Sequence, residues 1–318
     1  MSTLRRSSER TTDPLDSFVD EMRSYGLEPP AFVDVGKIVR MPARDDKPGR
    51  ESGWCIYYEI SDDFQLGGII GIGVFGSWKG NPEKKYWCSK RRETMSWDEQ
   101  HRLDEKIKAS RTARDLERIK MHGEASLRAV AMWEQSDQAP KQHPYLEAKG
   151  IKPHGVHSKW GKLLVPVMDD NQITSLQFIG NNGDKKFLRG GRTKGCYLRI
   201  GNRDTDTVYV AEGFATAATL YEITGNSCFV AFNASNLFAV ASAVCDLHPV
   251  AKIIIAGDDD RATKGNPGRT KASSAAGMLH CGVAFPEFDD NASPEDTDFN
   301  DMARLRSLEA VKLVLGWA

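Results

Sequence analysis

The alternation of apolar and polar positions divides the chain into segments of different expected structure. Four runs between residues 33 and 90 are rich in Gly, aromatic and β-branched residues, which is typical of strands: VGKIVRM, WCIYYEI, GGIIGIGVFG and KKYWC. They predict a small β-rich domain over residues 27–95. The polar residues 1–26 before it lack an apolar segment and predict a disordered leader.

The small domain contains a group of aromatic residues that admits two interpretations. They could stack on nucleic-acid bases, or they could form the core of a small sheet, which is the commoner use of such residues. The group consists of Trp54, Tyr57, Tyr58, Phe75, Trp78 and Trp87.

Residues 96–138 predict a helical linker. The segment from Ser96 to about Gln135 has no Pro and is dense in Glu, Lys, Arg, Ala and Leu. Ser96 and Glu99 have the spacing of a capping box, which marks the start of a helix. Apolar residues at helical spacing define the side that we expect to be buried: Leu103, Ile107, Leu116, Ile119, Leu127 and Val130.

The pattern changes twice more along the chain. Residues 139–205 predict a mixed α+β subdomain, with a short helix in HPYLEAKGI and a β-meander through KLLVPVMD, ITSLQFIG and KKFLRGG. Residues 206–318 alternate helices with the apolar strands TVYVA, SCFVAF, KIIIA and VAFP. Such alternation predicts an α/β domain in which a parallel sheet is flanked by helices.

Charge and composition narrow the classes of protein. Residues 141–205 carry 12 Lys and Arg against 5 Asp and Glu, whereas residues 206–318 carry 8 against 15. A basic module beside an acidic one suits an enzyme that holds a polyanion in one half and metal ions in the other. The six cysteines form no CxxC pair, so neither a disulfide framework nor a zinc ribbon is expected. No apolar run is long enough to span a membrane, and we expect a cytoplasmic protein.

Acidic residues follow the predicted strands of the α/β domain. Glu212 follows TVYVA, Asp258 and Asp260 follow KIIIA, and the segment after VAFP contributes Asp298 and Asp301. Open parallel sheets bind ligands beyond the carboxyl ends of their strands, so we expect these carboxylates to meet there. Oxygen ligands without His or Cys favour Mg²⁺ or Mn²⁺. A turn with helix caps would equally explain the aspartate pair alone, and the repetition at three strand ends is what favours a metal site.

A run of cations that contains no acid precedes the α/β domain. With its interspersed glycines it predicts contacts to phosphates of a template, a primer or a nucleotide, although a solvated hairpin would have the same composition. The cations are Lys185, Lys186, Arg189, Arg192, Lys194 and Arg199. Near the expected crevice, Asn233 and Asn236 could contact nucleotide or template, or only cap the next helix. Arg269 and Lys271, in the glycine-rich turn after the aspartates, could contact a phosphate.

Several stretches resemble a known family. VYVAEGFATAATL, AFNASNL, KIIIAGDDDRATKGNPGRTKASSAA and DTDFNDMA are similar to the Toprim domain of primases from conjugative plasmids and phages. Upstream, HPYLEAKGI and residues 162–201 resemble the start and the basic N-subdomain of the replicative primase core. The resemblance covers residues 140–318 and implies a C-terminal Toprim domain preceded by a primase N-subdomain.

The resemblance also implies roles for individual residues. Glu212 would position substrate or assist proton transfer, and Asp258 and Asp260 would hold the metal ion. Asp298 and Asp301 would hold a second ion or the nucleoside triphosphate. Two features depart from the replicative primases. Thr216 stands where they place an aspartate, and their zinc-ribbon template sensor is absent, its place being taken by the β-rich domain.

The implied activity is that of a DNA primase. It would make short primers from nucleoside triphosphates on a single-stranded DNA template by metal-dependent nucleotidyl transfer, with a separate replicative helicase as an open partner. Two alternatives remain, a Toprim-type metal-dependent nuclease and a non-catalytic single-strand-binding replication accessory protein. A topoisomerase is disfavoured because no tyrosine follows Tyr221, and the chain lacks the Walker A loop of a helicase motor.

Overall fold

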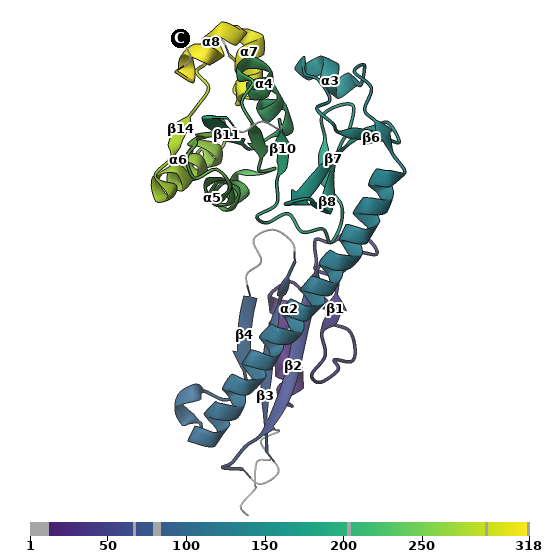
Figure 1. Ribbon diagram of the computed structural model, residues 1–318. Helices are drawn as coiled ribbons and strands as arrows, with labels where there is room; N and C mark the ends of the chain where they lie inside the picture. Colours follow the sequence, from purple (N-terminus) through teal and green to yellow (C-terminus); the bar gives the residue numbers. More distant parts are fainter. Residues whose placement is uncertain (1–12, 66–67, 79–83, 202–204, 290–291, 317–318) are drawn as a thin grey trace, which may run out of the picture. The chain divides into compact units, whose positions relative to one another are not determined.

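The computed structural model describes residues 13–65, 68–78, 84–201, 205–289 and 292–316. The chain forms two compact units, residues 1–119 and residues 120–318 (Figure 1). Among the described helices, none combines the length and the apolar character that crossing a bilayer requires.

The first unit is built on a four-stranded antiparallel sheet with the strand order β1-β2-β3-β4. Its strands are β1 (Val39–Met41), β2 (Gly53–Ser61), β3 (Ile69–Ser77) and β4 (Lys84–Cys88). A single 3-10 turn, Arg92–Thr94, follows β4. Each of the four runs that predicted a strand contains one, so the β-rich domain is confirmed.

The helix α1 (Pro14–Ser24) covers one face of this sheet. Asp13 caps its first turn, and Phe18 and Met22 are fully buried against the strands. The expectation of a disordered leader is therefore wrong for residues 14–24. Two large apolar side chains four residues apart are enough to bury one side of a short helix, and the polar composition around them hid that stripe. Residues 1–12 of the expected leader lie outside the described residues.

Half of the aromatic group is core. Trp54 is 2% exposed, and Tyr57 and Phe75 are fully buried. The rings of Tyr57 and Phe75 pack around Phe18 at centroid distances of 5.3 and 5.7 Å. Trp54 is on the opposite face, beneath Arg114 of the next helix. These three rings are not available to bases, so the core interpretation holds for them.

One helix, α2 (Trp97–Glu134), fills most of the expected linker and crosses the boundary between the two units. It starts with the expected capping box. Glu99 Oε2 accepts a hydrogen bond from the backbone N–H of Ser96 at 2.8 Å, and Ser96 Oγ accepts one from the backbone N–H of Glu99 at 3.1 Å.

The expected apolar side of α2 is only partly right. Leu103 is buried, but Leu116, Ile119 and Leu127 are 61–74% exposed. In the last third of the helix the buried positions are Ala125 and Ala129 instead. Small side chains allow the helix to lie close to its neighbours, and hydrophobicity alone did not distinguish these alanines from surface ones.

The second unit contains two sheets, the first of which is antiparallel with the order β5-β6-β7-β8-β9. The turns of its meander are at Asp170 and Gly183, where φ is 48° and 84°, as the Asp-Asn and Asn-Gly sequences predict. The mixed α+β N-subdomain is thus confirmed. Its elements are β5 (Asp137–Gln138), α3 (Pro144–Lys149), β6 (His157–Lys159), β7 (Lys162–Asp169), β8 (Gln172–Ile179) and β9 (Lys185–Phe187).

The second sheet has the order β10-β12-β11-β13-β14 and is parallel apart from β10. The α/β prediction is confirmed in both the type and the order of its elements. One boundary differs, because β10 comes from residues assigned to the preceding subdomain. The strands are β10 (Leu198–Ile200), β11 (Thr207–Ala211), β12 (Cys228–Val230), β13 (Lys252–Ala256) and β14 (Gly282–Ala284). The helices are α4 (Phe214–Thr224), α5 (Leu237–Leu247), α6 (Pro267–Leu279), α7 (Phe299–Leu305) and α8 (Leu308–Val314), with a 3-10 turn at Ala234–Asn236.

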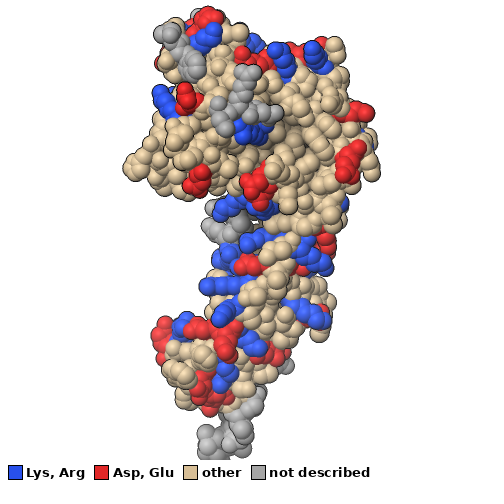
Figure 2. All heavy atoms as spheres, viewed as in Figure 1, with Lys and Arg blue, Asp and Glu red and all other residues tan. Residues whose placement is uncertain are grey.

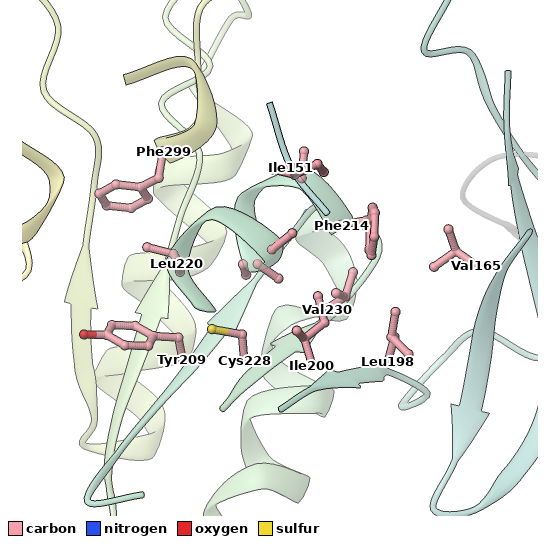
Figure 3. Close-up of a cluster of buried hydrophobic side chains, with 14 of the residues drawn as sticks. Ile151, Val165, Leu198, Ile200, Tyr209, Phe214, Leu220, Cys228, Val230 and Phe299 are labelled. Carbon is pink, nitrogen blue, oxygen red and sulfur yellow. The ribbon is translucent and has the colours of Figure 1, made fainter. Parts of the chain in front are cut away.

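A single core cluster joins the two sheets of the second unit. Figure 3 shows Val165 of β7 and Leu198 of β10 in the same cluster as Phe214 of α4 and Phe299 of α7. Within this cluster Val165 is fully buried, and Leu198 is 7% exposed. The basic subdomain and the α/β domain are therefore packed as one body, so the division expected at residue 206 does not separate two independent cores.

The close approach of α1 to its sheet yields a stability prediction. A Cβ on Gly73 would lie 1.9 Å from the ring of Phe18, so Gly73→Ala should destabilise the first unit by about 2 kcal/mol through overpacking. Urea denaturation followed by tryptophan fluorescence measures the change. Gly123→Ala in α2 is the control of opposite sign. Nothing lies within 4 Å of its added methyl group, and a gain of up to about 1 kcal/mol is expected. Equal effects of the two variants would contradict the packing described for Phe18.

Candidate active site

The candidate site begins with the register of two strands. The strands β11 and β13 are parallel neighbours, and Ala211 lies opposite Ala256. Glu212 follows the first strand directly, whereas Asp258 follows the second after one glycine. Both residues therefore leave the sheet at the same edge, which is where open parallel sheets bind their ligands.

The carboxyl groups at this edge are close enough to influence one another's charge. Burial raises the pKa of Glu212, and the negative charges of Asp260 and Asp298 raise it further. Burial also raises the pKa of Asp258, followed by the charges of Asp298 and Glu212. For Asp298, burial and then Asp301 raise the pKa. The edge is thus a place of like-charge repulsion that the protein does not fully neutralise.

Two carboxylate oxygens at this edge have no hydrogen-bond partner. Glu212 Oε2 and Asp258 Oδ1 are both buried and unpaired. Buried carboxylate oxygens are normally satisfied, so this pair fits a divalent cation bound through oxygen ligands. Among the described residues, no three acidic, His or Cys side chains already converge closely enough to enclose an ion. The case for a divalent cation therefore rests on the two unpaired oxygens and on the acidic character of the possible ligands. Few protein ligands are enough for Mg²⁺, because it commonly keeps several of its waters.

Asp260 is held by the start of the helix α6. Its Oδ2 accepts a hydrogen bond of 2.8 Å from the backbone N–H of Gly268. A Cβ at that glycine would lie 2.7 Å from the carbonyl oxygen of Asp258 and 2.9 Å from Asp260 Oδ2. A glycine is therefore needed where the acidic loop and the helix approach each other.

Asp259 belongs to a different network. Its carboxylate accepts hydrogen bonds from Arg269 at 2.9 Å and from Asn266 at 2.6 Å. Burial alone would raise the pKa of Asp259, but these two partners lower it. Asp259 therefore bonds to α6 residues, whereas Asp258 and Asp260 belong to the acidic edge. This difference is what we expect if successive side chains of the segment point to opposite sides.

Comparison with known proteins assigns this part of the chain. Residues 207–309 match the family described as Toprim domain. These residues are a Toprim domain. Two curated relatives, both named DNA primase TraC of Escherichia coli, are 32% identical over 304 and 307 residues. Each alignment covers 89% of this chain, but only 27% and 20% of the relatives, so the chain spans about a quarter of their length. A solved structure titled as the DnaG primase catalytic domain bound to ssDNA is 13% identical, with a TM-score of 0.43, covering 63% of this chain and 80% of that chain.

One position of the Toprim domain has an unusual environment. Thr216 in α4 is fully buried, and its hydroxyl has no hydrogen-bond partner. It lies near the acidic edge, because its Oγ1 is 3.5 Å from where a Cβ on Gly213 would be. A neutral side chain at this position thus adds no further charge to the crowded acidic edge.

A cation from the basic subdomain reaches the Toprim carboxylates. The Lys185 ammonium lowers the pKa of Glu212, Asp258 and Asp298, which opposes the larger effect of burial. Its Nζ is 3.8 Å from where a Cβ on Gly213 would be, beside the site. Lys185 is exposed, and it is the member of the predicted cation run that the structure brings to the acidic residues.

Asp301 has a role that differs from the expected metal contact. It is 6% exposed, and its Oδ1 accepts a hydrogen bond of 2.9 Å from Lys149 Nζ. Its Oδ2 accepts one from the backbone N–H of Thr297 at 3.1 Å. Burial would raise its pKa, but the bond from Lys149 lowers it. Both oxygens are thus occupied, whereas Asp298 remains a member of the acidic edge and caps α7.

Three other predicted contact residues have partners within the protein. Asn236 is 4% exposed and donates to the carbonyl oxygens of residues 193, 196 and 231. Arg199 bonds to Ser227 and lies over the ring of Phe229. Arg269 pairs with Asp259, as described above. Hydrogen-bonding capacity made these residues candidates, but it serves the fold here, and sequence alone cannot tell which partner such a group will find.

The remaining candidates stay on the surface. Arg192 pairs with Asp169, and Lys186 lies 3.8 Å from Asp184 with its side chain 75% exposed. Asn233 starts the 3-10 turn without a capping hydrogen bond from its side chain. Three more are exposed and have no carboxylate within ion-pair distance among the described residues: Arg189, Lys194 and Lys271.

The residues that hold the loop around Arg189 and Gly190, here called the basic loop, were not predicted from the sequence. Arg128 of α2 donates to the carbonyl oxygen of Arg189 at 2.9 Å, and His122 Nδ1 lies 2.9 Å from the carbonyl oxygen of Gly190. Lys149 was missed as well. Each acts on the backbone or on one carboxylate of a distant segment, so no local motif marks it.

The pKa of Asp258 is raised and that of its neighbour Asp259 is lowered, and this difference yields a prediction on stability. The raised pKa of Asp258 means that the folded state binds its proton more tightly than the unfolded state does. Wild-type stability therefore falls as pH rises from the ordinary aspartate pKa towards the raised value. In chelator at about pH 8, Asp258→Asn should raise the free energy of unfolding by on the order of 1 kcal/mol. This gain should vanish below the ordinary aspartate pKa.

Asp259→Asn is the matched control. Its lowered pKa means that its carboxylate stabilises the fold above the unfolded pKa and loses that contribution as pH falls through the folded value. A loss of about 1–2 kcal/mol is expected at neutral pH. Chemical denaturation across a pH series measures both variants. If Asp258→Asn instead lowers the free energy of unfolding, other groups of the protein already stabilise the Asp258 carboxylate, and the repulsion described here is contradicted.

Proposed function

We propose that the chain is a template-directed nucleotidyl transferase, a DNA primase that makes short primers on single-stranded DNA. The observation that carries the proposal is the position of Lys185, which belongs to the basic subdomain and lies beside the partly buried carboxylates of the Toprim domain. A triphosphate needs cationic partners and a divalent cation at the same place. The curated relatives named DNA primase align with 89% of the chain, which includes both the basic subdomain and the Toprim domain.

The proposed division of labour follows from the environment of each residue. Asp258 and Asp260 are the proposed ligands of Mg²⁺ or Mn²⁺, together with Asp298. Such an ion, when bound, would neutralise the triphosphate and acidify the attacking hydroxyl group. Burial raises the pKa of Glu212, which makes its carboxylate a stronger base than an ordinary glutamate, and Glu212 is the proposed acceptor of the hydroxyl proton. Lys185 would bind and orient the phosphates.

The proposed template path uses the exposed cations of the basic loop. Arg189 and Lys194 are exposed, and Arg128 fixes the backbone at Arg189. Contacts of this kind bind phosphates without reading sequence. Because the proposed template is single-stranded, the reaction requires an activity that separates duplex DNA. A separate helicase is the partner that this chemistry calls for.

Primer synthesis should depend on the acidic pair. With single-stranded DNA, labelled ribonucleotides and Mg²⁺ or Mn²⁺, the wild-type protein should form short oligonucleotides on a gel. Asp258→Ala and Asp260→Ala should each reduce their yield by at least about a hundredfold, because transition-state charge loses its stabilisation. Asp246→Ala is the control, since this exposed residue lies on α5. Shortened DNA would instead identify a nuclease, and shifted but unaltered DNA a binding protein.

Two adjacent lysines provide a matched test of phosphate binding. Lys185→Met should lower primer synthesis about tenfold or more, because Lys185 acts on the site carboxylates. Lys186→Met removes the same charge one residue away, where the side chain points to solvent near Asp184, and should change the yield less than about threefold. Steady-state rates at several nucleotide concentrations measure both. Equal effects would mean that Lys185 has no special position.

A further inference from the structure

The flank of the first unit where β4 meets α2 carries an exposed aromatic ring among cations. Tyr86 lies opposite Val74 in the sheet, and its neighbour Trp87 packs on the α1 side against Phe18. Because side chains alternate along a strand, Tyr86 faces the α2 side. We call the set Lys84, Tyr86, Arg111, Arg114 and Arg118 the β4–α2 flank. Figure 2 shows Lys and Arg side chains gathered along α2 and beside β4.

Tyr86 is the exposed aromatic residue of this flank. Its side chain is 48% exposed, and Arg111 donates a hydrogen bond of 3.4 Å to its hydroxyl. The guanidinium carbon of Arg111 lies 5.8 Å from the ring centroid. This hydrogen bond lowers the pKa of Tyr86, and the charges of Arg111, Arg114 and Lys84 lower it further. The ring is thus open to solvent in a positive field.

Two acids on α2 beside the flank's arginines already have cationic partners. Asp115 pairs with Arg118 at 3.2 Å. Glu117 pairs with Arg40 at 3.4 Å. Among the described residues, no carboxylate lies within ion-pair distance of the three remaining cations, which are Lys84, Arg111 and Arg114. Mutual repulsion of such cations is relieved by a polyanion.

Arg114 adds an independent observation. It is 5% exposed, its guanidinium carbon lies 5.4 Å from the centroid of Trp54, and its buried Nη1 has no acceptor. A buried guanidinium without a carboxylate is costly to keep. Its charge acts on Tyr86, at the surface of the flank.

We propose that the β4–α2 flank binds single-stranded DNA, with Tyr86 stacking on a base and Lys84 and Arg111 contacting phosphates. An exposed ring between unpaired cations is the combination that binds single strands without sequence preference, because every base has a face that can stack. The proposal goes beyond primer synthesis and does not depend on it, since the flank contains none of the acidic site residues. Tyr86 is absent from the aromatic group singled out in the sequence, half of which is core.

The first test measures stacking. Fluorescence anisotropy with a labelled oligothymidylate, in chelator, gives the affinity of the full chain. Tyr86→Ala should weaken binding by roughly tenfold, within the range of one base–aromatic stack. Tyr86→Phe keeps the ring and should bind like wild type. If Tyr86→Ala binds normally, or if both variants lose equally, the ring is not a stacking surface and the proposal fails.

The second test measures charge against a matched control. The double variant Lys84→Gln and Arg111→Gln should reduce the slope of log affinity against log salt by about 1.4, the effect of losing two phosphate contacts to a single strand. Arg44→Gln with Lys47→Gln removes the same charge from the exposed loop between β1 and β2, at the other edge of the sheet. If both double variants change the slope equally, the change reflects only the net charge of the protein, and the proposal is overturned.

The third test locates the contact. Oligothymidylate that carries 5-iododeoxyuridine should crosslink to the peptide containing Tyr86, both in wild type and in Asp258→Ala. Crosslinks confined to residues after 120 would place all binding in the second unit and rule the flank out. If the protein makes no primers but still crosslinks at Tyr86, the proposed catalytic function fails while this inference stands.

Discussion

Repulsion among partly buried carboxyl groups is the constraint around which the second unit is organised. The register of β11 and β13 delivers Glu212 and Asp258 to one edge, and the loop after β14 adds Asp298. A protein keeps such a cluster only when surrounding structure holds the groups in place. Here the holding elements are a backbone N–H at the start of α6 and the ammonium group of Lys185.

Several contacts between the basic subdomain and the Toprim domain serve this arrangement. Asn236 fixes the backbone around residues 193–196, and Lys149 bonds to Asp301 while its own carbonyl oxygen accepts from Asn300 at 2.7 Å. These are bonds between segments 40 to 152 residues apart. Two cations that act on the acidic residues, Lys149 and Lys185, thus come from outside the residues 207–309 that match the Toprim family. The folded body around the acidic edge is therefore larger than the Toprim domain itself.

Much of this fold was predictable, because its strands and helices have strong periodicity. The apolar strands TVYVA and KIIIA could only be buried, and acids directly after them had to meet at one edge of a parallel sheet. The sequence could not show that Asn236 and Arg199 are used internally, since a polar side chain looks the same whether it binds a carbonyl oxygen or a ligand. Nor could it reveal α1, where only Phe18 and Met22 are buried in a polar segment. The exposed Leu116 and Ile119 show the converse limit, because apolar spacing does not prove burial.

The strand β10 has a practical consequence for dissecting this protein. It pairs with β12 through Leu198 and Ile200 and occupies the outer position of the Toprim sheet, although it precedes the residues that match the family. A recombinant fragment that begins at residue 207 would lack β10. The backbone N–H and C=O groups of β12 that pair with β10 would then be exposed to solvent. Exposed edge strands of this kind pair with strands of other molecules and promote aggregation. Truncations aimed at the Toprim domain should therefore retain the polypeptide from before residue 198.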